Sequence, residues 1–182
     1  MTDAFLKALE KVGGVAVTCG MPQQVVASLA ERVRGPLLVP PCPSLLRLDL
    51  ANQLRAAGVE VIDADFRARA PTAGAGLTGA NFAIAATATV VLESTAEALR
   101  LASTLPAVHF VLLDPRKLVA DSTAAVPLLR QLHAHLPQAF LAYITGPSRT
   151  ADIERVLTIG VHGPKELYVL LCAGVSDDIM ES

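Results

Sequence analysis

The stretch YITGPSRTADIERVLTIGVHGPKELYVLL, residues 143–171, contains two glycine-proline corners and many of the unusual polar residues of the chain. The apolar run Phe140–Ile144 leads into it and predicts a buried strand that ends at the turn residues Thr145-Gly146-Pro147. After the second corner, the run Leu167–Leu171 predicts another buried strand. The two corners, at Pro147 and Pro164, are therefore expected at the ends of two strands.

A helix is expected between these two strands, opening after Pro147 and ending at Gly160. Ser148 or Thr150 can cap this helix, and its acidic first turns and apolar stripe come from Asp152, Glu154, Ile153, Val156 and Leu157. The unpaired N–H groups at such a helix start favour a phosphate or carboxylate, to which Arg149 and Lys165 could add charge. The same residues also fit a simple turn with a helix cap, so the pattern leaves both interpretations open.

Short apolar runs alternate with helical stretches along the rest of the chain. Strands are expected at Val15–Thr18, Leu37–Val39, Val59–Ile62 and Val108–Leu113, with one or two central strands within Phe82–Leu92. Helices are expected at 1–13, Pro22–Arg34 and Ser44–Ala57, from a capping box at Ser94-Thr95-Ala96-Glu97 through about Ser103, and from Asp121 or Ser122 to Pro137. This alternation predicts an α/β three-layer sandwich with a mostly parallel sheet, and 182 residues with 52% hydrophobic content predict one domain over residues 1–182.

The segment Ala68–Ala80 is rich in Gly, Pro, Thr and Ala and is expected to be a long loop, either functional or mobile. Its Gly74, Gly76 and Gly79 form a G-x-G-x-x-G pattern. A dinucleotide site is not expected here, because that motif needs a strand before it and a helix after it. The glycines are expected to let the loop turn or to let the backbone approach a ligand closely.

Charge and cysteine usage exclude several classes of protein. The net charge is −2 with no basic run, which gives no footprint for nucleic acid. The uncharged interval Ala70–Leu92 is broken by Pro and Gly, and its unbroken half is too short for the ~20 residues of a membrane span. The N-terminus mixes charges and is not a signal peptide, so a cytoplasmic location is expected.

Cys19, Cys42 and Cys172 contain no C-x-x-C pair and are expected to be buried free thiols, with no metal site.

Two blocks of sequence resemble the signatures of the lactate-utilisation (LUD) domain family, in particular its C-type branch. They are TGPSRTADIE at 145–154 with GVHGPKELYVLL at 160–171, and GLTGANFAIAATATVVLES at 76–94. The resemblance implies a fold similar to the group that contains glucosamine-6-phosphate isomerase, ribose-5-phosphate isomerase, CoA transferases and formyltetrahydrofolate cyclo-ligase. It implies a cluster-free component of a lactate-utilisation system, with no cofactor of its own, that supports oxidation of L-lactate to pyruvate with iron–sulfur oxidoreductase subunits.

The chain departs from the family pattern in the central block. Where the family usually reads AETGT, this chain has Ala85-Ala86-Thr87-Ala88-Thr89. Ala86 removes a carboxylate that could act as base, nucleophile or ligand, and Ala88 adds a methyl group, so independent catalysis is in question. An alternative function is a stand-alone binding protein or enzyme acting on a phosphorylated, nucleotide or CoA-like small molecule.

Candidate site residues are sought in loops beyond the carboxyl ends of the strands. The candidate ligand-binding residues are Gly79, Asn81, Thr87, Thr89, Gly146, Ser148, Arg149, Thr150, Gly163 and Lys165. His162 is the candidate catalytic residue because a histidine side chain titrates near neutral pH, although a loop histidine bonded to a carbonyl is the alternative. His109 is expected to be a satisfied buried histidine, and His133 and His135 to face different directions on a helix. The Pro147 and Pro164 corners are expected to lie side by side around a shared crevice.

Overall fold

The computed structural model describes residues 1–136, 138–151 and 157–181. The helices are α1 (Thr2–Lys11), α2 (Pro22–Arg32), α3 (Pro43–Arg47), α4 (Leu50–Ala56), α5 (Phe66–Arg69), α6 (Glu97–Thr104) and α7 (Ser122–His135), with 3-10 turns η1 (Ala70–Thr72) and η2 (Pro115–Lys117). The strands are β1 (Val15–Cys19), β2 (Leu37–Leu38), β3 (Val61–Ile62), β4 (Ala75–Gly79), β5 (Phe82–Ile84), β6 (Thr89–Glu93), β7 (Val108–Leu113), β8 (Leu118–Val119), β9 (Leu141–Ile144), β10 (Arg149–Thr150), β11 (Thr158–Ile159) and β12 (Glu166–Cys172).

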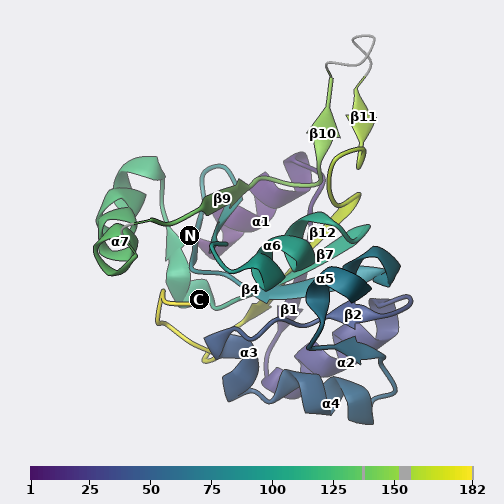
Figure 1. Cartoon of the computed structure of the whole chain (residues 1–182). Coiled ribbons are helices and arrows are strands. Elements are labelled where there is room, and N and C mark those ends of the chain that lie inside the picture. The colour runs from purple at the N-terminus through teal and green to yellow at the C-terminus, as the bar shows by residue number, and fades with distance from the viewer. Residues whose placement is uncertain (137, 152–156, 182) are drawn as a thin grey trace.

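The main sheet has six strands in the order β1-β12-β7-β4-β2-β3, and every pairing is parallel (Figure 1). Its central strands are continuous apolar runs, as expected for a parallel sheet that is covered on both faces. The predicted α/β class is therefore confirmed, and the main sheet is wholly rather than mostly parallel. In the described part of the chain, no helix is long and apolar enough to cross a membrane.

A second sheet of four strands, in the order β8-β5-β6-β9, lies against the main sheet. The β5–β6 and β6–β9 pairings are antiparallel, whereas β5 pairs with β8 in parallel. The segment Phe82–Leu92 thus forms two strands, as predicted, but both belong to this second sheet and not to the centre of the main one. The strand at Leu141–Ile144 is also not buried as predicted, because it lies at the sheet edge and its Tyr143 is exposed.

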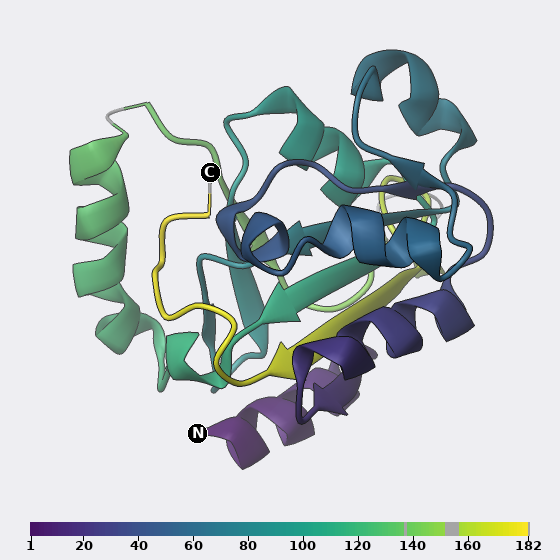
Figure 2. The same cartoon turned by 90° about the horizontal axis from the view of Figure 1, so that it is seen from below.

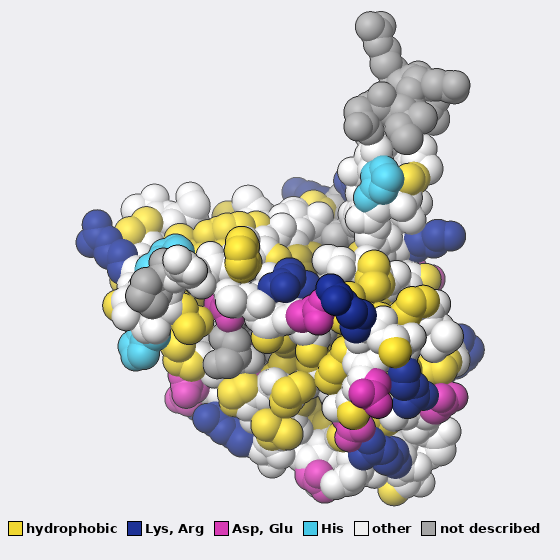
Figure 3. Space-filling view, in the orientation of Figure 1, with side chains coloured by type: hydrophobic (Ala, Val, Ile, Leu, Met, Phe, Trp, Pro, Cys, Tyr) yellow, Lys and Arg dark blue, Asp and Glu magenta, His cyan; other side chains and the backbone are white. Residues whose placement is uncertain are grey.

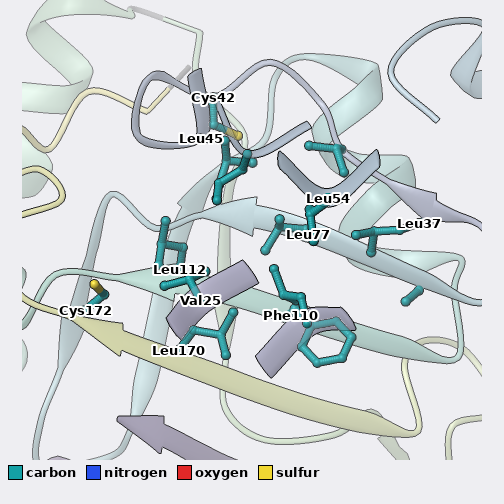
Figure 4. Packing of buried hydrophobic residues seen from close by; sticks show 14 of the residues in the cluster. Val25, Leu37, Cys42, Leu45, Leu54, Leu77, Phe110, Leu112, Leu170 and Cys172 are labelled. Atoms are coloured by element: carbon teal, nitrogen blue, oxygen red, sulfur yellow. The ribbon is translucent and has the colours of Figure 1, made fainter. Parts of the chain in front are cut away.

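Helices α2, α3 and α4 cover one face of the main sheet, and α1, α6 and the second sheet cover the other (Figures 1 and 2). On one face, side chains of α2, α3 and α4 pack on alternate residues of the strands, among them Leu77, Phe110 and Leu170 (Figure 4). On the other face, Val111 and Val169 pack against α1 and the second sheet, while Leu38 packs against Ala102 of α6. Period-two alternation along the strands therefore divides the core into two layers, as the three-layer prediction requires.

The predicted loop Ala68–Ala80 is wrong, because this segment contains the end of α5, the turn η1 and the buried strand β4 between β2 and β7. The small residues that suggested a loop serve close packing instead. A Cβ atom on Gly76 would lie 1.9 Å from the carbonyl oxygen of Ala102, so glycine allows helix α6 to lie directly on the strand. No dinucleotide loop is formed, because Gly76 and Gly79 belong to strand β4 and Gly74 comes directly before it.

The helix predicted between Pro147 and Gly160 is wrong at both of its described ends. Arg149–Thr150 pairs antiparallel with Thr158–Ile159 to form an arm, β10–β11, that projects from the body (Figure 1). Residues 152–156, which include the expected acidic first turns, lie outside the described residues, as does Pro137. Because Ser148 precedes a strand, it has no helix dipole to offer an anion, and the helix-start argument for phosphate binding fails.

Two helix boundaries differ from the predictions. The single helix expected at Ser44–Ala57 is split into α3 and α4 around Asp49, which has a positive φ of 47°. Helix α6 begins at Glu97, later than a capping box at Ser94 predicts, and it has no side-chain cap because its N-cap residue is Ala96. The Ser94 hydroxyl donates instead to the carbonyl oxygen of Phe140. The helix expected from Asp121 or Ser122 does have its cap, since the Asp121 side chain accepts from the N–H of Ala124.

Candidate functional site

The two glycine-proline corners lie side by side. The N–H of Ser148 donates to the carbonyl oxygen of Pro164 at 2.9 Å, and Gly160 donates to the carbonyl oxygen of Ser148 at 2.9 Å. Between them is a crevice of about 380 Å³, within the size range of small-molecule sites. Its lining comes from the end of α6, the starts of β7 and β12, and both corners, and includes Ser103, Thr104, His109, Thr145, Gly146, Ser148, Arg149, His162, Gly163 and Leu167.

The first corner packs on the C-terminal end of α1. Gly146 has a φ of +76°, and a Cβ atom there would lie 2.4 Å from the carbonyl oxygen of Val12, so both conformation and space require glycine. Arg149 Nη2 donates to the same Val12 carbonyl at 2.5 Å, which places a cation at the negative end of the helix. The guanidinium is exposed, so it is a bridge to α1 at the rim of the crevice.

His109 forms part of the crevice wall and is 1% exposed. Its Nε2 is 2.9 Å from the Thr78 hydroxyl, but Nδ1 has no hydrogen-bond partner in the described part of the chain. Burial lowers the pKa of His109 to about 3, so the ring is neutral near pH 7. The prediction of a satisfied buried histidine is therefore only half right, and no local pattern in the sequence indicates an unpartnered ring nitrogen.

A chain of hydroxyl groups leads from the central block to the crevice. Thr87 Oγ1 lies 2.7 Å from Thr89 Oγ1, which in turn lies 2.8 Å from Thr145 Oγ1 at the rim. Ala88, between the first two, has a positive φ of 52°, a conformation for which glycine is better suited. The structure thus connects the predicted Thr87 and Thr89 to the predicted corner through Thr145, which was not among the candidates.

The remaining candidates divide between three places. Gly163 lies against Ser148 in the crevice, whereas Thr150 belongs to the arm and exposed Lys165 lines an adjoining hollow with His162. Gly79 and Asn81 lie at the opposite end of the strands, because Gly79 is three residues beyond Gly76, the register partner of His109. The crevice is therefore near the amino ends of β7 and β12, not at their carboxyl ends as expected.

Asn81 is fully buried and its hydrogen bonds are internal. Its Nδ2 donates to the carbonyl oxygen of Ile179 at 2.7 Å, and its Oδ1 accepts from the N–H of Glu93 at 2.6 Å. Beside it, Lys117 and Glu181 form a buried ion pair, with side chains 2% and 0% exposed. The sequence analysis missed both residues, because 64 positions separate them and neither belongs to a recognisable motif.

Acidic, histidine and cysteine side chains are the groups that could hold a metal ion. Among residues 1–136, 138–151 and 157–181, no group of three or more of them is placed to hold a metal ion. The cysteines are buried free thiols as predicted, and Cys19 and Cys172 are register partners on β1 and β12. Burial raises the pKa of Cys42 to about 12, which keeps this thiol protonated and unreactive.

Lys and Arg side chains alternate with Asp and Glu on the face shown in Figure 3, without forming one continuous basic patch. Several are surface ion pairs, such as Arg55 with Asp63 at 2.6 Å and Arg67 with Glu97 at 3.0 Å. This mixed surface agrees with the near-neutral net charge of −2. It offers no electrostatic feature that would steer nucleic acid to this face.

Comparison with known proteins gives relatives across most of the chain. Lactate utilization protein C of Anoxybacillus flavithermus is 33% identical over 154 residues, which cover 82% of this chain and 67% of that protein. Lactate utilization protein C of Geobacillus kaustophilus is 30% identical over 195 residues, covering 93% and 79%. Uncharacterized protein NMB1437 of Neisseria meningitidis serogroup B is 41% identical over 97 residues, covering 53% of this chain and 41% of that protein. For this last protein, the match spans less than half of its length.

The fold has a solved counterpart in a DUF162 family protein from Deinococcus radiodurans. The TM-score is 0.63 with 17% sequence identity, and the match covers 94% of this chain and 95% of that one. At this identity the likeness concerns the fold alone. The LUD domain matches residues 3–172, which include both signature blocks and nearly every element of the two sheets. The chain therefore belongs to the LUD domain family.

Proposed function

We propose that this protein is the cluster-free component of a lactate-utilisation system and supports the oxidation of L-lactate to pyruvate together with iron–sulfur partner proteins. The observation that carries the proposal is the match to proteins named lactate utilization protein C over 82% and 93% of the chain. The matches cover 67% and 79% of the length of those proteins. The activity and the partners of the whole lactate-utilisation system are therefore part of the proposal.

The division of labour follows from the side chains. Oxidation of L-lactate to pyruvate removes two electrons and two protons, and iron–sulfur clusters bound by cysteine thiolates can carry such electrons. The cysteines of this chain are buried in the core of the main sheet, where Cys19 and Cys172 pack among apolar side chains. We therefore assign the electron-carrying clusters to partner proteins and a binding or assembly role to this chain.

The test is growth on L-lactate after deletion of the encoding gene. We expect growth on L-lactate to be lost while growth on glucose is unchanged, with recovery on re-expression of the chain. A tagged copy purified from lactate-grown cells should bring down iron-containing proteins, measured as iron content and visible absorbance. Normal growth of the deletion strain on L-lactate, with no iron in the purified fraction, would contradict the proposal.

The crevice is the part of this chain that we propose to be its ligand site. The cavity of about 380 Å³ is lined by Ser148, Thr145, His162 and His109, and the buried Nδ1 of His109 has no hydrogen-bond partner among the described residues. A buried unpartnered ring nitrogen is costly unless a ligand or water satisfies it. His162, as the candidate catalytic residue, is exposed at the rim and free to meet a bound molecule.

Complementation of the deletion strain tests the crevice separately from the family assignment. We expect His162→Ala and Ser148→Phe to restore growth on L-lactate at least tenfold less well than the unchanged chain. The matched control is His133→Ala, because His133 is an exposed histidine on α7 and does not line the crevice. Full complementation by both crevice variants would contradict the proposed ligand site without contradicting the proposed role in lactate utilisation.

The second candidate function is a stand-alone binding protein or enzyme for a phosphorylated, nucleotide or CoA-like small molecule. What supports it is the same cavity with Arg149 at its rim, without the helix start that the sequence suggested. Titration with adenosine monophosphate, coenzyme A and L-lactate would distinguish the two candidates. Tight binding of coenzyme A or the nucleotide, lost in Arg149→Ala but kept in Lys165→Ala, would favour the second candidate over the first.

A further inference from the structure

Near the carboxyl ends of β2, β4 and β7, and separate from the crevice, Ser44, Gly79 and Lys117 form a buried polar cluster, termed the pocket because the Glu181 side chain fills it. Ser44 follows β2, Gly79 ends β4, and Lys117 lies in the turn after β7. In open parallel sheets, ligands bind beyond these strand ends, because the loops that follow the strands converge there. In this chain the place is filled by the carboxylate of Glu181, which comes from the segment after β12.

The pocket requires a negative group. Lys117 is 4% exposed, and its Nζ donates to the carbonyl oxygen of Ala80 at 3.1 Å and to Glu181 Oε1 at 2.5 Å. Without an anion, the ammonium group would be a buried charge with one neutral partner, a strongly unfavourable state. The other carboxylate oxygen, Oε2, accepts from the backbone N–H of Ser44 at 3.0 Å. An ammonium group and an amide on two sides match a flat, two-oxygen carboxylate.

The pocket also offers more than Glu181 uses. The Ser44 hydroxyl belongs to a residue that is 2% exposed and has no hydrogen-bond partner among the described residues. Gly79 keeps the space open, because a Cβ atom there would lie 2.6 Å from both Ser44 Oγ and Glu181 Oε2. A hydroxyl that is buried, unpartnered and next to the carboxylate oxygen is a feature of a site for a ligand with an additional polar group.

The segment that supplies Glu181 is fastened partly by weak contacts. It runs between α7 and α3 in both views of the fold (Figures 1 and 2). Asp177 forms an ion pair with Arg116 at 3.1 Å, and Asp178 forms one with Arg47 at 3.8 Å. All four side chains are about half exposed or more, and ion pairs between exposed side chains contribute little to stability. Ile179 is the buried apolar anchor of this stretch. The carbonyl oxygen of Ile179 also accepts from Asn81 Nδ2 at 2.7 Å, so opening of 177–181 would break these contacts but none of the strand pairings of the main sheet.

We propose that the pocket formed by Ser44, Gly79 and Lys117 is a binding site for a small monocarboxylate, and that Glu181 is its internal occupant, displaced when such a ligand binds. This site lies outside the crevice and does not depend on the proposed function. Because Glu181 is part of the chain, its effective concentration is high, and a free carboxylate must compete with it. Removing the Glu181 side chain should expose the site to any small carboxylate.

The first experiment uses Glu181→Ala in the full chain with sodium acetate as the probe and sodium chloride as the ionic-strength control. Acetate should raise the Tm of this variant saturably, by about 3–6 °C at roughly ten times its Kd, and chloride should not. The double variant Glu181→Ala/Lys117→Met should lose the acetate response. Asp178→Ala is the matched control, since it removes an exposed carboxylate from the same segment and should show no acetate response.

The second experiment tests displacement in the unchanged protein by amide hydrogen exchange. Acetate at the concentration that saturates Glu181→Ala should speed exchange in 177–181 at least threefold while leaving α7 unchanged. In Glu181→Gln, which keeps the shape of the side chain without its charge, the same opening should need at least tenfold less acetate. This variant also keeps the test decisive if Glu181→Ala does not fold.

Three results would overturn the proposal. The first is an absent acetate response in both Glu181 variants, and the second is an acetate response that persists without Lys117. The third is unchanged exchange of 177–181 in the unchanged protein at concentrations that rescue Glu181→Ala. This last outcome would show that Lys117 and Glu181 form a permanent structural ion pair instead of a ligand site with an internal occupant.

Discussion

The pocket around Lys117 and the crevice between the two corners satisfy their polar groups in different ways. At the carboxyl ends of the strands, the buried Lys117 and Glu181 neutralise each other, and the Asn81 amide uses both its oxygen and its nitrogen. In the crevice, the buried Nδ1 of His109 has no partner among the described residues, and the Thr145 hydroxyl is exposed at the rim. One region is closed by the chain itself, whereas the other has exposed polar groups at its rim.

This difference implies that the two regions serve stability and binding to different degrees. Breaking the Lys117–Glu181 pair leaves a buried charge, which is strongly unfavourable while 177–181 stays in place. Breaking a contact at the exposed rim of the crevice leaves a group that water can reach. Substitutions in the closed region should therefore have larger effects on stability than substitutions at the rim of the crevice.

Lys117→Met should have the largest effect, a loss of about 3–5 kcal/mol in the free energy of unfolding. The Glu181 carboxylate would remain buried with the Ser44 N–H as its hydrogen-bond donor. The double variant Lys117→Met/Glu181→Leu should recover most of the loss, because it removes both charges. Urea unfolding with an unchanged m-value measures both. A loss below about 1 kcal/mol in the single variant would mean that the region is solvated and that the contrast fails.

His109 predicts an intermediate effect with a defined pH dependence. The pKa of this histidine falls from 6.5 to about 3 on burial, so the unfolded chain binds a proton there below pH 6.5 and the folded chain does not. Stability present above pH 6.5 is therefore lost as the pH falls towards 3. The contribution of this residue between pH 6.5 and 5 should be a loss of about 2 kcal/mol.

His109→Gln isolates that contribution, because glutamine keeps a polar group near Thr78 and does not titrate. The difference in unfolding free energy between the unchanged protein and this variant should shift by about 2 kcal/mol from pH 6.5 to pH 5, and stay constant from pH 7 to 8. A difference that does not vary with pH would show that water or another group reaches Nδ1. A ligand that accepts or donates at Nδ1 should bind more weakly to the variant.

The sequence carried enough information for the elements whose signal is local. Continuous apolar runs gave β7 and β12, and turn residues gave the two corners that meet in the crevice. It failed for β4, whose AGLTG reads as a loop, because the need for glycine at Gly76 arises from the approach of α6. The arm was missed for a similar reason, since Arg149 and Thr150 are fixed by pairing with Ile159 and Thr158 and not by local preference.

The candidate site was predictable to a similar degree. Gly146, Ser148, Arg149, His162 and Gly163 do meet in one crevice, because the corners that contain them flank elements that the apolar pattern located. Lys117 and Glu181 could not be predicted, since a buried ion pair between single residues 64 positions apart leaves no periodic signal. His109 was recognised as buried, but the absence of a partner at Nδ1 depends on which side chains surround it.

Thr89→Val tests the hydroxyl chain at the rim of the crevice and should have a smaller effect. Valine keeps the shape and strand preference of threonine but removes the hydroxyl between Thr87 and Thr145. Both neighbours are exposed and can bond to water instead, so the loss should be about 1 kcal/mol or less. Thr87→Val removes the outermost of the three linked hydroxyl groups, and its loss in the free energy of unfolding should be smaller still because Thr87 is exposed. A larger loss from Thr87→Val, measured by the same urea unfolding, would show that the chain of hydroxyls is not ordered as described.

Arg149→Met should have the smallest effect on stability, about 0.5 kcal/mol or less, because an exposed guanidinium at a helix end is screened by water and salt. Its bond to the Val12 carbonyl can be replaced by water, and Gly146 already fixes the approach of this corner to α1. Lys165→Met, which removes an exposed cation from the adjoining hollow, is the matched control. Raising sodium chloride from 0.05 to about 0.5 M should shrink the small Arg149→Met effect further. A loss above about 2 kcal/mol in the free energy of unfolding would instead show that Arg149 stabilises the corner strongly. The polar groups of the crevice would then be satisfied within the chain, as they are in the pocket around Lys117.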